Sequence, residues 1–177
     1  MGVADLLEVA EIVFWPTALD AKFEDLERVK HLDIAMFFGA VRTEEHAHLV
    51  RLLREKARLF VAFGSCACFG GVPGLANLWF RDEILRRVYL ETTSTDNPHA
   101  ILPGAGEEAL DLPPLTRWCR PVDDLVTVDV YAPGCPPPVE RIRDLVEAVK
   151  RFAAGESLPQ GIVLAGEKTL CDECPLE

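Results

Sequence analysis

Short apolar runs alternate along this chain with segments whose apolar residues recur every three or four positions. The runs have the length of buried strands and cover Glu11–Trp15, Leu32–Gly39, Arg58–Gly64 and Leu125–Tyr131. The periodic segments predict helices over Phe23–Val29, after the capping residue Thr43, around Ile84–Val88, and beyond Pro138. Alternation of this kind is typical of an α/β fold, and we predict a doubly wound, mostly parallel sheet with helices on both faces.

Two stretches depart from this alternation. The section from Glu91 to Asp124 is rich in proline, which predicts loop in place of regular structure. Residues Val3 to Ala10 have the pattern of the end of a helix that leads directly into the first strand. A doubly wound sheet normally has a strand before that helix, so we expect the chain to lack the first strand of its fold.

Composition and charge narrow the classes of function. A length of 177 residues suits a single domain, and a net charge of −11 argues against a nucleic-acid surface, which needs clustered Lys and Arg. No apolar run approaches the roughly 18–20 residues of a membrane span. The N-terminus lacks the basic and apolar regions of a secretory signal, so we expect a cytoplasmic protein without membrane insertion, whose six cysteines are reduced thiols.

Two of these cysteines follow predicted strands, in loops rich in glycine or proline. Cys66 lies in Gly64-Ser-Cys-Ala-Cys-Phe-Gly-Gly71, and Cys135 lies in Pro133-Gly-Cys-Pro-Pro137. Because the carboxyl ends of parallel strands meet at one edge of a sheet, we expect the two thiols to converge there. Thiolates gathered from separate loops are the usual ligands of iron–sulfur clusters and zinc.

The remaining candidate ligands carry weaker signals. Cys119 has no glycine and no second thiol beside it, and we expect a small buried side chain. Cys68 would point away from Cys66 in an extended loop, which makes it a neighbour of the site and not a ligand. Cys171 and Cys174 form a lone C-x-x-C that suits a metal, a redox dithiol or a plain tail. Asp20 is a possible hard ligand to iron, but a solvated loop acid is the better explanation, and the four histidines suit surface or structural positions.

The sequence resembles a known family through these loops and four further segments. Gly64-Ser-Cys66 with Gly70-Gly71, followed by Pro133-Gly-Cys-Pro-Pro137, is similar to the small subunit of nickel–iron hydrogenases and the related 20-kDa subunit of respiratory NADH:ubiquinone oxidoreductase. The further segments look like the cytoplasmic, methyl-viologen-reducing branch, where this small subunit is the gamma subunit; they are Val13–Asp20, Gly71–Asn77, Ser94–Pro98 and Lys168–Pro175.

The resemblance implies a flavodoxin-like domain that we place at residues 1–165, followed by a tail at 166–177 with the C-x-x-C. In the family, a 4Fe–4S cluster takes four cysteines, two of them from a C-x-x-C after the first strand. Cys66 and Cys135 match the other two positions, and the first pair would lie upstream of Met1. Family members continue past the segment that matches Cys171–Pro175 into a cysteine-rich segment that carries further clusters. Here Cys171 and Cys174 form an isolated pair, two candidate metal ligands where a cluster or zinc needs four.

The function implied is that of an electron-transfer subunit of an oxidoreductase, without an active site of its own. Hydrogen would be split in a nickel–iron large subunit, and electrons would leave through the cluster to further electron-transfer subunits. We expect the large subunit to dock on Val72–Phe80, unless that segment is buried within the chain itself. The alternatives are a cluster-free structural or assembly subunit, a zinc- or dithiol-bearing module built on Cys171 and Cys174, and a flavodoxin-like flavin binder.

Overall fold

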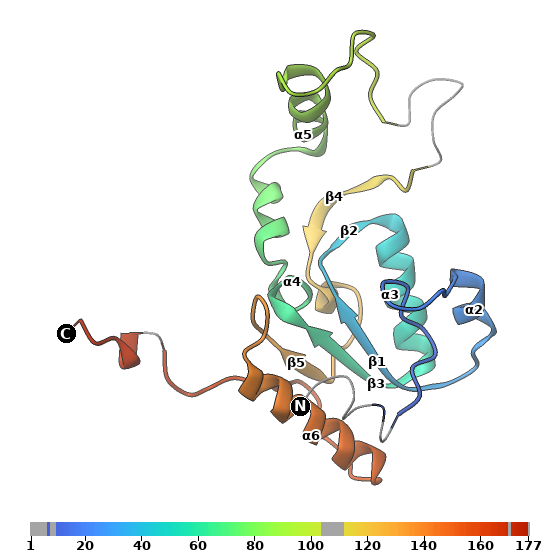
Figure 1. The fold of residues 1–177 in the computed structure, drawn as a ribbon, viewed down its shortest axis with the longest axis vertical. Coiled ribbons are helices and arrows are strands. Elements are labelled where there is room, and N and C mark those ends of the chain that lie inside the picture. The colour runs from blue at the N-terminus through green and yellow to red at the C-terminus, as the bar shows by residue number, and fades with distance from the viewer. Residues whose placement is uncertain (1–6, 8–9, 104–111, 170, 177) are drawn as a thin grey trace.

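The computed structural model describes residues 7, 10–103, 112–169 and 171–176 (Figure 1). Its strands are β1 (Leu32–Phe38), β2 (Val41–Thr43), β3 (Ala57–Phe63), β4 (Leu115–Arg120), β5 (Val130–Ala132) and β6 (Ile162–Val163). Its helices are α2 (Phe23–Arg28), α3 (Glu44–Lys56), α4 (Gly64–Phe69), α5 (Arg81–Arg86) and α6 (Val139–Ala153). Short helical turns complete the description: η1 (Val72–Leu78), η2 (Arg87–Glu91), η3 (Val122–Asp124) and η4 (Cys171–Glu173).

The centre of the molecule is a four-stranded parallel sheet in the order β1-β3-β5-β6. The strand β3 pairs with β1 along its whole length and with β5 at its carboxyl end, where Phe63 lies opposite Ala132. β2 and β4 form a separate antiparallel pair beside this sheet. All four parallel strands therefore end at one edge, and α4 begins directly at the end of β3 (Figure 1).

Helices cover both faces of this sheet, as a doubly wound fold requires. Alternate residues of β3 belong to two separate apolar clusters: Phe60 packs with the inward residues of α3, and Val61 packs with those of α6. Thr43 caps the N-terminus of α3: its Oγ1 accepts a hydrogen bond from the backbone N–H of His46 at 3.1 Å. The α/β, mostly parallel, doubly wound fold expected from the alternation is confirmed.

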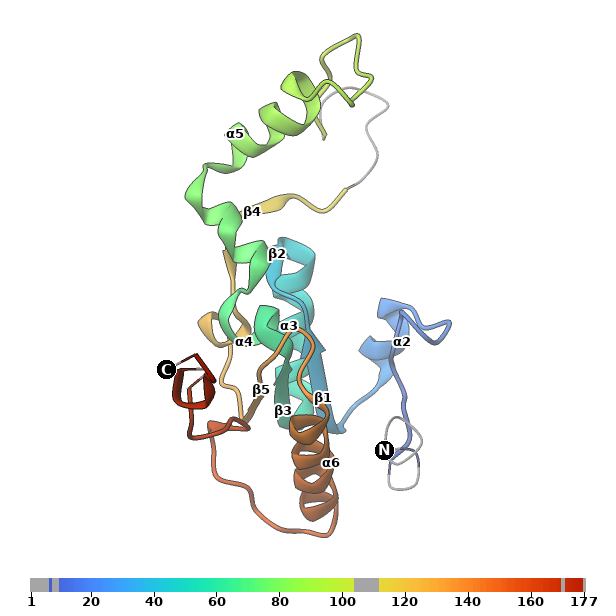
Figure 2. The ribbon, with the colours of Figure 1, turned by 60° about the vertical axis from the view of Figure 1, so that its left-hand side comes forward.

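A second feature is an arm that projects from the sheet domain. Figures 1 and 2 both show η1, α5 and the segment after it leaving the body beside α4, with the chain returning along β4. Several of its apolar side chains lie in solvent, with exposed fractions of 73% for Leu78, 55% for Trp79 and 60% for Phe80. These side chains are available for contact with another molecule.

The structure corrects several expectations about the elements. The segment Glu11–Trp15 is not a strand, because no described strand lies beside it to take its backbone hydrogen bonds; Phe14 packs on the core through its side chain. The fourth strand is shorter than Leu125–Tyr131 and begins at Val130. The proline-rich section contains β4, and β6 was not predicted. The helix expected over Val3–Ala10 falls mainly on residues outside those described, and the domain division at residue 165 stays a prediction.

Candidate functional site

Two reciprocal hydrogen bonds join the loops that carry Cys66 and Cys135. The backbone N–H of Ser65 donates to the carbonyl oxygen of Gly134 at 2.8 Å, and the N–H of Gly134 donates to Oγ of Ser65 at 3.1 Å. Each cysteine is the next residue along the chain. The carboxyl ends of β3 and β5 therefore hold these two segments side by side, as the sequence predicted for the loops; the ligand roles of the thiols stay predictions.

Two glycines permit this close packing. At Gly134, where φ is +135°, a Cβ would lie 2.4 Å from Cα of Pro137. At Gly71, where φ is +55°, a Cβ would lie 2.8 Å from Sγ and 2.9 Å from Cα of Cys66. Both positions exclude any larger residue without a shift of the backbone. Gly71 thus forms one wall of the space that the Cys66 thiol occupies.

Cys66 and Cys68 lie on the six-residue helix α4, not on an extended loop. Two helical positions are about 200° apart, so the expected opposite orientation is retained. Cys68 is buried, and its thiol donates to the carbonyl oxygen of Ala62 at 3.4 Å. Burial raises the pKa of Cys68 to about 11, so this thiol stays protonated at neutral pH. Cys66 is half-buried and Cys135 is exposed.

Cys119, on β4, is buried as expected, and its surroundings include Cys66. Burial is the main reason that its pKa is raised; the positive charge of Arg42 opposes this shift and the charge of Cys66 adds to it. The side-chain amide of Asn77 holds its backbone, donating from Nδ2 to the Cys119 carbonyl oxygen and accepting from the Cys119 N–H, both at 2.8 Å. Sequence reasoning gave Asn77 no role, because its partner lies 42 residues away.

Cys171 and Cys174 share one exposed turn at the C-terminal end of the described chain, where the N–H of Cys174 donates to the carbonyl oxygen of Cys171 at 3.3 Å. Within the ranges that the structure describes, no group of three or more His, Cys, Asp or Glu side chains is arranged to hold a metal ion. The described thiols therefore do not by themselves complete a four-thiolate cluster site.

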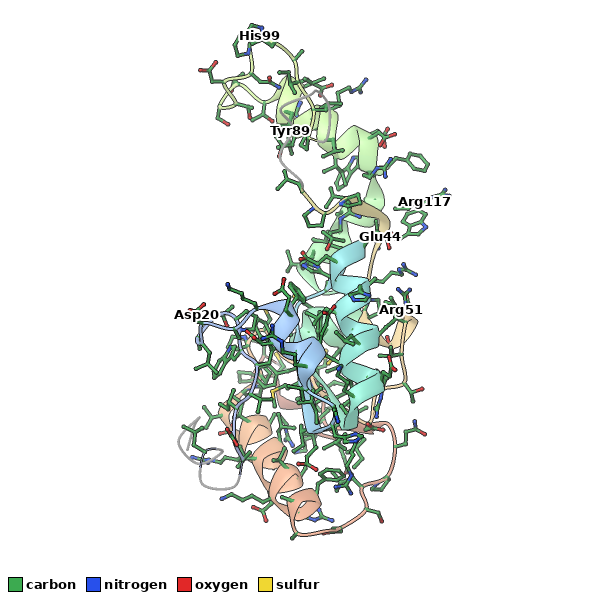
Figure 3. The ribbon with its side chains drawn as sticks, turned by 90° about the vertical axis from the view of Figure 1, so that its right-hand side faces the viewer. Asp20, Glu44, Arg51, Tyr89, His99 and Arg117 are labelled. Atoms are coloured by element: carbon green, nitrogen blue, oxygen red, sulfur yellow. The ribbon has the colours of Figure 1, made fainter. Side chains whose placement is uncertain are left out.

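The other polar candidates lie apart from this edge. Figure 3 shows Asp20 on the loop ahead of α2 and His99 at the far end of the arm. His46 is half-buried, where a position facing solvent was expected; its Nδ1 accepts from the backbone N–H of Arg42 at 3.5 Å. His46 therefore serves the local structure at the start of α3.

A groove of about 390 Å³ opens between the loop after α4 and strand β4. The residues that shape it include Gly71, Gly74, Asn77, Trp118, Cys119 and Arg120. Its rim is apolar and exposed, with exposed fractions of 64% for Phe69 and 59% for Leu75. The rim continues into Val72–Phe80, whose large side chains Val72, Leu75, Leu78, Trp79 and Phe80 are all exposed, so the alternative that this segment is buried within the chain is wrong.

In the part of the chain that the structure describes, no helix has the length and apolar character needed to cross a bilayer.

Comparisons with known proteins agree with the fold. Residues 1–149 match the family described as NADH ubiquinone oxidoreductase, 20 Kd subunit. An F420-non-reducing hydrogenase iron-sulfur subunit of Archaeoglobus profundus is 39% identical over 97% of this chain and 55% of its own length. An F420-non-reducing hydrogenase vhu subunit of Methanocaldococcus jannaschii is 38% identical over 96% of this chain and 54% of its own. The chain thus spans about half the length of the curated relatives it matches.

A solved structure gives an independent comparison. A chain of the crystal structure of NAD+-reducing NiFe hydrogenase in the H2-reduced state aligns with a TM-score of 0.63 and 32% identity, over 73% of this chain and 68% of that one. The sequence match covers most of the chain, and the alignment covers most of the fold. The chain therefore belongs to the NADH ubiquinone oxidoreductase 20 Kd subunit family.

Proposed function

We propose that this chain is an electron-transfer subunit of a nickel–iron hydrogenase-like oxidoreductase, of the cytoplasmic, methyl-viologen-reducing type. The observation that carries the proposal is the reciprocal pairing of Ser65 with Gly134, which holds two cysteine-bearing segments at one edge of the sheet. The names of the relatives support it, since they include iron-sulfur and other subunits of hydrogenases. In this proposal Cys66 and Cys135 provide two of the four thiolates of a 4Fe–4S cluster, and the resemblance assigns the others to a C-x-x-C that the printed sequence does not include.

A bound cluster would supply one-electron transfer, and the chain's own residues would set its surroundings. The thiols of Cys66 and Cys135 would hold the iron as thiolates, so their protons must leave when metal binds. Gly71 would leave room for the Cys66 sulfur, and the buried, protonated Cys68 would stay out of the ligand set. Burial and hydrogen bonds near the sulfurs tune the potential of such a site.

The partner in this proposal is a nickel–iron large subunit, with further electron-transfer subunits beyond it. The exposed apolar side chains of Val72–Phe80 support a docking role for the arm, because a monomer rarely leaves so many large apolar groups in water. Cys171 and Cys174 form a second thiolate pair, which we propose as metal ligands in the assembled complex.

A second candidate function is a structural or assembly subunit that binds no cluster. The observation that favours it is the absence, among the described residues, of any group of three or more ligands arranged around one point. Both functions use the same docking surface, so binding to the large subunit does not separate them. The iron content of the complex distinguishes the two functions.

The deciding experiment measures iron and acid-labile sulfide in the assembled complex. We expect Cys66→Ser and Cys135→Ser each to remove one cluster's iron, together with absorbance that bleaches on reduction. Cys119→Ser, a control at a buried thiol, should retain the iron. A wild-type complex without iron or sulfide in this subunit would favour the assembly function, and zinc without sulfide would favour a zinc module. Equal loss of iron in all three variants would mean that the ligands are misassigned.

A further inference from the structure

The groove between the loop after α4 and strand β4 contains a cationic side chain without a partner among the described residues. Arg120 lines the groove, and its Nε is buried. Nε has no hydrogen-bond partner, and no hydrogen bond or ion pair of the guanidinium to any other described residue is found. A buried donor left without an acceptor costs free energy, so Arg120 stands out as a cation that the described part of the chain does not satisfy.

The rest of the groove defines what kind of acceptor fits. Gly74 contributes no side chain, and nothing lies within 4 Å of the place where its Cβ would be, which leaves open space in the groove. The amide of Asn77 is occupied by the backbone of Cys119, so it offers little competition for a ligand. The rim formed by Phe69, Leu75 and Trp118 is apolar and exposed. An apolar rim around one half-buried cation is complementary to a single anionic group carried on an apolar segment.

The charge of Asp124 affects which kind of anion the groove can accept. Asp124 also lines the groove, and it forms no ion pair with Arg120 in the described structure. Its negative charge disfavours a doubly charged group such as phosphate more than a singly charged carboxylate. A carboxylate also matches the fork of a guanidinium, which can donate two parallel hydrogen bonds to its two oxygens.

We propose that this groove receives an Asp or Glu side chain from the large subunit, whose carboxylate accepts hydrogen bonds from the Arg120 guanidinium. The inference rests on the proposed function, since the rim is continuous with the apolar surface of Val72–Phe80 assigned to that partner. It adds a specific polar anchor to a surface that is otherwise apolar. Charge-assisted anchors of this kind, desolvated at the centre of an interface, contribute strongly to affinity.

The test measures the dissociation constant between the purified chain and the large subunit encoded in the same organism. We expect Arg120→Gln to raise this constant about tenfold or more, because a charge-assisted hydrogen bond is lost. Arg81→Gln is the matched control: it removes the same charge from the exposed start of α5, where Arg81 pairs with its neighbour Asp82, and it should change the constant less than about threefold. Equal constants for Arg120→Gln and wild type would overturn the proposal.

Thermal unfolding of the isolated variants separates docking from folding. Because Nε of Arg120 lacks a partner in the described chain, Arg120→Gln should unfold at the wild-type temperature or above it. A marked fall in that temperature would show that the guanidinium serves the fold, and would overturn the proposal. Arg120→Lys keeps the charge without the planar fork, and we expect a dissociation constant between those of wild type and Arg120→Gln.

Two further results distinguish the possible failures. If the wild-type chain forms no complex with the large subunit, the proposed function fails with this inference. If the complex forms and only phosphate or acetate, titrated by calorimetry, binds in an Arg120-dependent way, the groove takes free anions and only this inference fails. The positive identification is a double-mutant cycle, in which Arg120→Gln and the neutralisation of one large-subunit carboxylate are strongly non-additive.

Discussion

Arg54 and Asp129 form a partly buried ion pair that ties helix α3 to the start of strand β5. Nη1 of Arg54 lies 2.5 Å from Oδ2 of Asp129, and the two side chains are 24% and 19% exposed. The same carboxylate oxygen accepts from the backbone N–H of Phe60 at 2.7 Å, and Nη2 of Arg54 donates to the carbonyl oxygen of Ala57 at 2.6 Å. The Arg54–Asp129 pair thus supplies hydrogen bonds at the C-terminal end of α3 and between β3 and the start of β5.

Asp129→Asn tests this connection. The substitution keeps the size of the side chain and removes its charge, so the ion pair with Arg54 is lost and the bond to Phe60 is weakened. We expect the free energy of unfolding to fall by about 2 kcal/mol in urea denaturation. Asp33→Asn is the control, because Asp33 and its partner Arg58 are 81% and 69% exposed and their pair should contribute less than about 0.5 kcal/mol. Equal losses in the two variants would contradict the role given to burial.

The same contact explains why one strand was predicted too long. The apolar run Leu125–Tyr131 marks a buried strand correctly, but only Val130–Ala132 pairs as one. At Asp129 the side chain takes the N–H of Phe60, while the Asp129 carbonyl accepts from Gly161 and Ile162. The apolar pattern of the sequence indicates which residues are buried. It does not indicate that the carboxylate of Asp129 accepts the backbone N–H of Phe60.

The candidate site also has one part that the sequence predicts and one part that it does not. The glycine-bearing cysteine loops were found from the sequence, because each follows an apolar strand and parallel strands end at one edge. The groove was not found, because its Arg120 comes from β4, inside a section that its prolines marked as loop. The local sequence from Gly64 to Gly74 contains no cation, and tertiary structure brings one there from a distant part of the chain.

Gly71→Ala tests the close approach to Cys66. A Cβ at this position meets Sγ and Cα of Cys66 at 2.8 and 2.9 Å, and φ at +55° is strained for any residue but glycine. We expect a loss of about 2 kcal/mol in unfolding free energy and a lower iron content in the assembled complex. Gly74→Ala is the control, since nothing lies within 4 Å of a Cβ there. A Gly71→Ala protein with wild-type stability would show that the wall beside Cys66 is not tight.

Thiol alkylation tests the ranking of the cysteines. The pKa of Cys68 is raised to about 11, so at pH 8 roughly one Cys68 in a thousand is a thiolate, and its burial blocks access as well. Iodoacetamide should therefore modify the exposed Cys135, Cys171 and Cys174 of the metal-free chain first, with Cys68 and Cys119 last. Peptide mass spectrometry over time gives the order. Unfolding in urea should make the rates similar, and early modification of Cys68 in the folded chain would contradict its buried position.

The pKa of Cys68 also sets a dependence of stability on pH. The unfolded thiol ionises near its usual pKa of 9.0, whereas the folded thiol keeps its proton up to about 11. Between these values the unfolded state binds fewer protons than the folded state, so stability falls as pH rises. Cys68→Ala should flatten this slope in urea unfolding measured from pH 8 to pH 11. An unchanged slope in that variant would assign the pH dependence to other groups.

Ser65→Ala tests the contact on which the proposed function depends. The variant removes the Oγ that accepts from the N–H of Gly134 at 3.1 Å, and it leaves the bond from the Ser65 N–H to the Gly134 carbonyl oxygen in place. We expect a loss of about 1 kcal/mol in unfolding free energy, as for one hydrogen bond of a half-buried group. Ser157→Ala, at an exposed position after α6, should cause no measurable loss of unfolding free energy.

Because the lost bond holds the turn before Cys135, the assembled Ser65→Ala complex should also release its iron faster to a chelator. Release at the wild-type rate, together with the expected loss of stability, would mean that this contact serves the fold and does not position Cys135.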